Sequence, residues 1–243
     1  MKSILNVPNL RFPGFEGEWK IVKLESLGQI VGGGTPDTTK LEYWNGDIQW
    51  FTPSEVGKEK YVTKSYRQIT LSGLSNSSAK ILPVGSILLS SRATVGECSI
   101  NLIECCTNQG FQSFIPSQYV DGEFLFYLLQ THKKDFLRRA CGSTFLEISA
   151  KQIGKITSSI PRRTEQQRIA ALLALLDQRI AIQNKVIEDL KKLKTALCEI
   201  LYDESEPNKL IGEIIEQISI RNWKGESLKV LSVLAISLLK YSR

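Results

Sequence analysis

The chain has one histidine, no long apolar run and no phosphate-binding motif, and each shortage excludes a class of function. His132 alone cannot build a histidine-based metal cluster, and a Ser-His or Cys-His nucleophile would depend on it entirely. No 18 consecutive residues are apolar, so no membrane-spanning helix is expected. No Gly-Lys-Ser/Thr follows the only glycine-rich run, residues 32–36, which excludes a phosphate loop of that type. We therefore predict no metal site, and a stand-alone hydrolase or nuclease is the weakest interpretation.

Cysteine usage and the N-terminus bear on the cellular compartment. The five cysteines are odd in number, and their spacing fits neither a zinc site nor a disulfide framework. Residues 1–9 lack the charged end and apolar run of a secretory signal. We expect a cytoplasmic protein with reduced and mostly buried thiols.

Positive charge is in modest excess and is unevenly placed. Lys and Arg outnumber Asp and Glu by 31 to 25, which gives a net charge of +6. Residues 133–168 carry nine basic side chains against three acidic ones, so this stretch alone accounts for the excess. Such a cluster favours an anionic partner such as nucleic acid, although a solvated surface gives the same composition.

Short strands dominate the pattern of the first 160 residues. Alternating or continuous apolar runs bounded by Gly, Pro and polar residues predict strands, and a 3.6-residue period predicts a helix. The predicted strands cover residues 19–30, 47–51, 81–89, 111–115 and 153–160, and the predicted helix covers residues 122–137. The prediction is a strand-rich α+β domain over residues 1–161.

A long amphipathic helix is predicted over residues 162–202. Thr164 and Gln167 have the spacing of a capping box, and no Gly or Pro occurs from Glu165 to Leu201. At 1.5 Å per residue the helix is about 55 Å long, which favours a partner helix over packing on its own domain. The residues predicted to pair are Ile169, Leu172, Leu173, Leu176, Ile180, Ile187, Leu190 and Leu197.

The last 41 residues, 203–243, read as a linker and the truncated start of a second module. Residues 203–208 are polar, and residues 209–218 faintly echo residues 23–30.

Several short motifs occur in a characteristic order across roughly 200 residues. They are Leu10-Arg11-Phe12-Pro13-Gly14-Phe15 with Glu18-Trp19, Gly33-Gly34-Thr35-Pro36, Ile81-Leu82-Pro83-Val84-Gly85-Ser86-Ile87-Leu88, Ser91-Arg92-Ala93-Thr94-Val95-Gly96, Thr107-Asn108-Gln109-Gly110, and Pro161 with Glu165-Gln166-Gln167-Arg168-Ile169-Ala170. In this order the chain resembles the specificity subunit of Type I restriction-modification systems, in a half-length form.

The resemblance implies a function in DNA recognition without catalysis. A complete subunit of this family has two target recognition domains, which read a bipartite double-stranded DNA site, and two helices that pair as an antiparallel coiled coil. The helices dock adenine-methylating modification subunits, and a restriction subunit can join. S-adenosylmethionine belongs to the modification subunits, so no cofactor is expected here. With one domain and one helix, this chain is expected to form a homodimer that reads a palindromic split site.

Candidate DNA contacts are polar or basic residues in the predicted loops. Cations suit phosphates, and amide, hydroxyl or guanidinium groups suit base edges. The candidates are Thr35, Lys58, Lys60, Lys64, Arg92, Asn108, Gln109, Ser143, Thr144 and Lys151. Each is equally compatible with a solvated surface, and Asn108 also suits a structural turn. The main alternative function is a scaffolding protein that oligomerises through the long helix without binding DNA.

Overall fold

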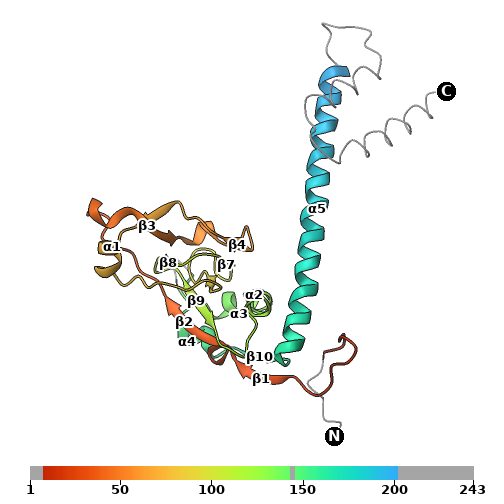
Figure 1. The fold of residues 1–243 in the computed structure, drawn as a ribbon, viewed down its shortest axis with the longest axis horizontal. Coiled ribbons are helices and arrows are strands. Elements are labelled where there is room, and N and C mark those ends of the chain that lie inside the picture. The colour runs from red at the N-terminus through yellow and green to blue at the C-terminus, as the bar shows by residue number, and fades with distance from the viewer. Residues whose placement is uncertain (1–7, 143–145, 202–243) are drawn as a thin grey trace, which may run out of the picture. The chain divides into compact units, whose positions relative to one another are not determined.

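The structure is a computed structural model that describes residues 8–142 and 146–201 (Figure 1). It divides into two compact units, residues 1–174 and residues 175–243, and the long helix α5 (Arg163–Leu201) contributes to both. The predicted linker and second module, residues 203–243, lie outside the described residues.

Three small sheets organise the first unit. The largest has five strands in the order β2 (Gly28–Gly32), β9 (Gln112–Pro116), β6 (Ile87–Leu89), β7 (Cys98–Asn101) and β4 (Tyr61–Val62). A second has the order β5 (Arg67–Ile69), β3 (Trp44–Phe51) and β8 (Cys105–Thr107). The third pairs β1 (Lys20–Lys23) with β10 (Thr157–Ile160) in antiparallel fashion. Neighbours such as β1 and β10 are far apart in sequence, so much of the sheet pairing is non-local.

The core of this unit consists of three apolar clusters. The largest gathers Leu24, Phe114 and Phe136, all fully buried, with the inner faces of α2 (Gly122–Thr131) and α3 (Lys133–Arg139). Burying one large apolar side chain contributes about 1.5–3 kcal/mol. Ile169, Ala170 and Leu173 of α5 also pack against this cluster, so the first turns of the long helix belong to the domain.

The predicted α+β class is confirmed, but the bounds of several strands and helices differ. The strand predicted over residues 19–30 is two strands, β1 and β2, in different sheets, because a 3-10 turn at Leu24–Ser26 interrupts it. The single helix predicted over residues 122–137 is two helices, because the backbone leaves helical geometry at His132 with φ −88° and ψ 4°. His132 bonds Asp135 in the next turn and has a structural position. The strand predicted from residue 153 begins only at Thr157, because a capping box of Ser149 and Gln152 starts the short helix α4 (Ala150–Gly154).

The long helix is confirmed, but its predicted cap is wrong. α5 has 39 residues, which corresponds to about 58 Å. It begins at Arg163, so Thr164 lies inside the first turn and is not the N-cap residue. The amides of Glu165 and Gln166 instead both donate to the Arg162 carbonyl, at 2.9 and 3.0 Å.

Candidate nucleic-acid interface

The glycine run after β2 packs tightly against the turn at residues 107–110. The Gly34 amide donates to the Thr107 carbonyl at 2.8 Å. A Cβ added to Gly33 would lie 2.1 Å from the Asn108 carbonyl oxygen, and one added to Gly34 would lie 2.2 Å from Ser78 Oγ. Neither glycine has a positive φ. Close backbone approach is therefore what requires glycine at these two positions.

This packing brings two predicted site residues into contact. Thr35 Oγ1 donates to Gln109 Oε1, and Gln109 is exposed whereas Thr35 is half-buried. Asn108 behaves differently, because its Oδ1 accepts the Gly110 amide at 2.9 Å and closes the turn. Thr35 and Gln109 therefore present one polar pair to solvent, and Asn108 shapes the turn beneath it.

The loop carrying Arg92 lies beside the same turn. The Ser91 amide donates to the Gly110 carbonyl at 2.8 Å, and Thr94 Oγ1 donates to the Pro53 carbonyl at 3.2 Å. Arg92 is about two-fifths exposed and pairs with Glu147 through Nη2 at 2.5 Å. Three segments from distant parts of the sequence thus pack side by side, and we call them the loop surface: residues 33–36, 90–96 and 107–110. Many of their residues are buried, and the polar side chains that reach solvent include Thr35, Arg92, Thr94 and Gln109.

Two tryptophans of β3 bind the backbone of the glycine run and of the residue that follows it. Trp50 Nε1 donates to the Gly34 carbonyl at 2.8 Å, and Trp44 Nε1 donates to the Asp37 carbonyl at 3.1 Å. Their rings meet edge to face with centroids 5.1 Å apart. The exposed guanidinium of Arg67 stacks on Trp44, with Cζ 3.5 Å from the ring centroid. Sequence reasoning missed Arg67, because its aromatic partner lies on a neighbouring strand and no local pattern marks the pair.

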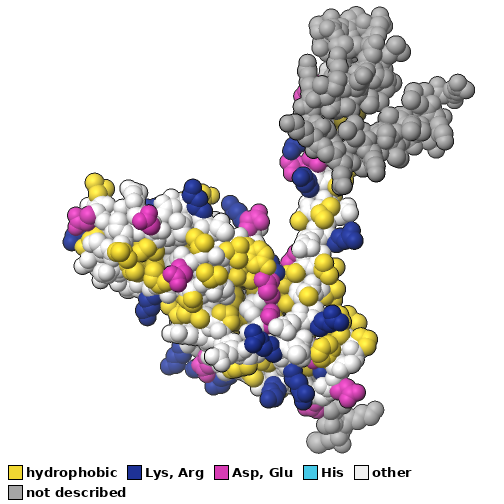
Figure 2. Space-filling view, viewed as in Figure 1, with side chains coloured by type: hydrophobic (Ala, Val, Ile, Leu, Met, Phe, Trp, Pro, Cys, Tyr) yellow, Lys and Arg dark blue, Asp and Glu magenta, His cyan; other side chains and the backbone are white. Residues whose placement is uncertain are grey.

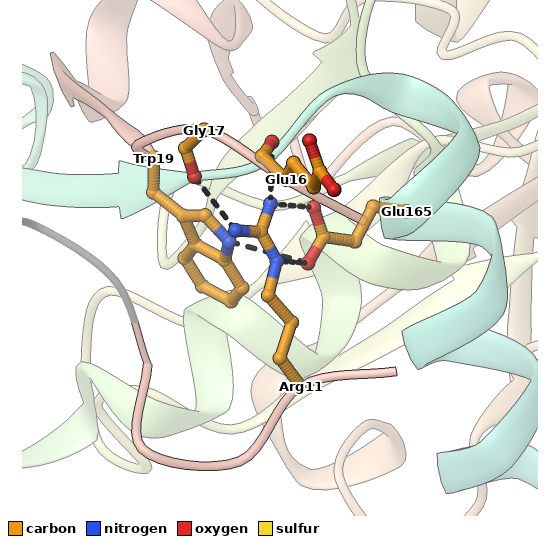
Figure 3. A network of polar contacts seen from close by, with 5 residues as sticks. All are labelled: Arg11, Glu16, Gly17, Trp19 and Glu165. Atoms are coloured by element: carbon orange, nitrogen blue, oxygen red, sulfur yellow. Dashed lines mark hydrogen bonds and ion pairs between the residues drawn. The ribbon is translucent and has the colours of Figure 1, made fainter. Parts of the chain in front are cut away.

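A second network joins the N-terminal motif to the start of α5 (Figure 3). Arg11 holds Glu165 with two hydrogen bonds of 2.8 Å, from Nε and Nη2, and Trp19 Nε1 adds a third at 3.3 Å. The Glu165 side chain is only 2% exposed. The hydrogen bond to Glu165 raises the pKa of Arg11, so the cation is retained. This network fixes the start of the long helix on the domain, which is a structural role.

Basic side chains of residues 133–168 are mostly exposed. Lys133 and Arg138 form ion pairs with Glu97 and Asp135. The others are exposed and form no ion pair with a described residue; these are Lys134, Arg139, Lys151, Lys155, Arg162, Arg163 and Arg168. Figure 2 shows dark-blue Lys and Arg side chains along the lower edge of the first unit. The positive excess predicted from sequence is thus available to solvent.

Comparison with known proteins decides the family. Residues 16–192 match the family model described as "Type I restriction modification DNA specificity domain". The chain is 35% identical to the Type I restriction enzyme MjaIX specificity subunit of Methanocaldococcus jannaschii, over 88% of this chain and 52% of that protein. It is 29% identical to the EcoR124I/EcoR124II specificity subunit of Escherichia coli, over 75% and 46%.

The chain belongs to the type I restriction-modification DNA specificity domain family. The resemblance drawn from the ordered motifs is confirmed. The fold is also similar to the crystal structure of the HsdS subunit from Thermoanaerobacter tengcongensis, with a TM-score of 0.57, 21% identity, and coverage of 80% of this chain and 47% of that one. The chain spans about half the length of the curated relatives it matches.

The remaining predicted contacts of this specificity domain have different environments. Lys58, Lys64 and Lys151 are exposed, and none forms an ion pair with a described residue. Lys60 is only 15% exposed, because it pairs with Glu123 and lies 4.5 Å from the Tyr127 ring centroid. It ties β4 to α2 and is poorly placed for a phosphate. Ser143 and Thr144 lie outside the described residues.

The apolar stripe of α5 separates into an inner and an outer part. Ile169 and Leu173 pack on the core of the specificity domain, and Leu197 is half-buried. The outer part is 41–58% exposed and consists of Leu172, Leu176, Ile180, Ile187 and Leu190.

Cysteine burial agrees with the sequence-based expectation. Cys98, Cys105 and Cys106 are buried, and Cys141 and Cys198 are exposed. Within residues 8–142 and 146–201, no group of three or more His, Cys, Asp or Glu is arranged to hold a metal ion. In the same part of the chain, no helix is both long and apolar enough to cross a membrane.

Proposed function

We propose that the chain is the DNA sequence-recognition subunit of a type I restriction-modification complex. It binds double-stranded DNA and directs partner adenine methyltransferase subunits, and where present a restriction subunit, to a split site. Its own role is non-catalytic, and S-adenosylmethionine is used by the partner. The proposal rests on family membership together with one observation: the loop surface.

The loop surface has the chemistry that base and phosphate contacts need. Thr35 and Gln109 supply a hydroxyl and an amide at one point, and Arg92 supplies a guanidinium from the adjacent loop. Glu147 holds Arg92 through Nε and Nη2 on one carboxylate oxygen, which orients the side chain and reduces the entropy lost on binding. Exposed Lys58, Lys64 and Lys151 add sequence-independent attraction to phosphates.

The assembled complex provides the test. The full chain is mixed with the modification subunit of its own organism, S-adenosylmethionine and genomic DNA, and methylated adenines are mapped by sequencing. We expect one split motif whose methylation requires the chain. The double variant Thr35→Ala/Gln109→Ala should relax or abolish the motif, and Lys23→Ala, on β1 of a different sheet, should leave it unchanged. Failure to form a complex, or an assembled complex that binds no DNA at any salt concentration, would favour the scaffolding alternative.

We further propose that the outer stripe of α5 pairs with a second copy of the chain. Five large apolar side chains at helical spacing and about half exposed favour burial against another helix. Two-fold pairing predicts a palindromic split motif.

The oligomeric state tests this pairing. Sedimentation of the purified chain should give about twice the 27.3 kDa chain mass. Leu176→Glu/Ile180→Glu should lower the mass to that of one chain, and Gln178→Glu, on the opposite side of the helix, should not. A wild-type monomer at micromolar concentration would contradict the homodimer.

A further inference from the structure

Arg67 is an exposed cation that is held in a fixed orientation. It lies on β5, opposite Trp50 in the antiparallel register with β3. Its guanidinium carbon is 3.5 Å from the Trp44 ring centroid and 5.8 Å from that of Trp50. None of the described residues forms an ion pair with it or accepts a hydrogen bond from its guanidinium. The hydrogen-bonding edge is therefore available while one face is covered.

The platform under Arg67 is rigid. Trp44 and Trp50 are 6% and 4% exposed, and each indole N–H is bound to a backbone carbonyl. A guanidinium stacked on such a surface keeps its plane, because both cation–π attraction and planar contact favour that orientation. Little side-chain freedom remains to be lost when the edge meets a ligand.

The two tryptophans near Arg67 also bind the backbone at and just after the glycine run. The carbonyls bound by the two indoles belong to Gly34 and Asp37, which flank Thr35. The residue before Arg67 is also held in place. The amide of exposed Tyr66 donates to Glu55 at 2.6 Å, and the Glu55 carboxylate also accepts a hydrogen bond from Thr52 Oγ1. The stacked arginine and the Thr35–Gln109 pair thus share one structural support.

We propose that Arg67 reads a guanine in the DNA site. Two parallel N–H donors on a planar fork match O6 and N7 of guanine in the major groove, which is the commonest specific contact of arginine with DNA. The same fork can bind a phosphate with two hydrogen bonds, but that contact carries no sequence information, so the effect of substitution on the motif distinguishes the two. The inference rests on the proposed function and names a residue that determines its specificity.

The experiment compares Arg67→Lys, Arg67→Ala and the control Lys23→Ala in the methylation assay with the full complex. Arg67→Lys keeps the charge and removes the fork and the stacked plane, so it tests base reading even if Arg67→Ala folds poorly. We expect both Arg67 variants to accept other bases at one guanine of the wild-type motif, with discrimination at that position reduced by roughly 5- to 150-fold. The motif of Lys23→Ala should match the wild type.

The outcomes separate this inference from the proposed function. A wild-type complex that methylates no motif overturns the proposed function and the role of Arg67 with it. A wild-type motif that is unchanged in Arg67→Lys and Arg67→Ala overturns only the role of Arg67. Methylation reduced equally at all sites identifies a phosphate contact and likewise overturns base reading. Relaxation confined to one guanine supports it.

Discussion

Gly32 and Gly33 are adjacent, yet the same substitution is expected to have opposite effects at the two positions. In Gly33→Ala the new Cβ would lie 2.1 Å from the Asn108 carbonyl oxygen and 2.3 Å from that of Thr107, so the two segments must separate by roughly 1 Å. Overpacking of this kind costs about 1–3 kcal/mol, and loss of the bond between the Gly34 amide and Thr107 adds about 1 kcal/mol. We expect destabilisation by about 2–4 kcal/mol.

Gly32→Ala serves as the matched control. Its Cβ would meet nothing closer than 3.7 Å, and Gly32 has no positive φ. Reduced freedom of the unfolded chain should stabilise this variant by about 0.4–1 kcal/mol. Thermal unfolding followed by circular dichroism should place Gly33→Ala roughly 5–15 °C below the wild type, and Gly32→Ala at or slightly above it. Equal unfolding temperatures for the two variants would refute the argument from close backbone approach.

Three further results are expected. A thiol reagent at pH 8 should modify Cys141 and Cys198 in the folded chain and all five cysteines in denaturant. The other three thiols are protected because burial raises the pKa of Cys98 and Cys105 to about 12 and that of Cys106 to about 11. Rapid labelling of Cys98 in the folded chain would contradict this. The hydrogen bond from His132 lowers the pKa of Asp135 below 3.8, so this carboxylate stabilises the fold above that pH, and the stability is lost as the pH falls through the folded value. Asp135→Asn should therefore lower the unfolding temperature at pH 7 and match the wild type in strong acid; an equal difference at both pH values would count against the pair. Arg11→Ala should lower the unfolding temperature more than Lys23→Ala. Arg11 pairs with Glu165, which is 2% exposed and would be left buried without a partner, whereas Lys23 pairs with Glu25, which is 52% exposed. Equal losses would argue against a structural role for Arg11.

Local patterns predicted several elements well. The strand predicted at residues 47–51 lies within β3, and the long run without Gly or Pro forms α5. These predictions succeed because helix and strand periodicity and the breaking effect of Gly and Pro act over a few residues. The boundaries were weaker: the geometry at His132 and the cap at Ser149 each altered a predicted element.

The candidate site depended on contacts that local patterns do not encode. Lys60 and Lys64 look equivalent in sequence, but the aromatic side chains of α2 and the carboxylate of Glu123 engage only Lys60. No sequence pattern marked Arg67 as a candidate contact, because its stacking on Trp44 exists only in the folded chain.

The sequence alone determined the class of fold, the long helix and, through the order of its motifs, the family. Only the tertiary structure decided which polar residues stand together. Thr35 and Gln109 are 74 residues apart, and their contact exists because Gly33 and Gly34 allow two backbones to approach more closely than any side chain permits. Likewise, whether a lysine or arginine is available to DNA depends on the neighbours that folding provides, and those neighbours come from distant strands and helices.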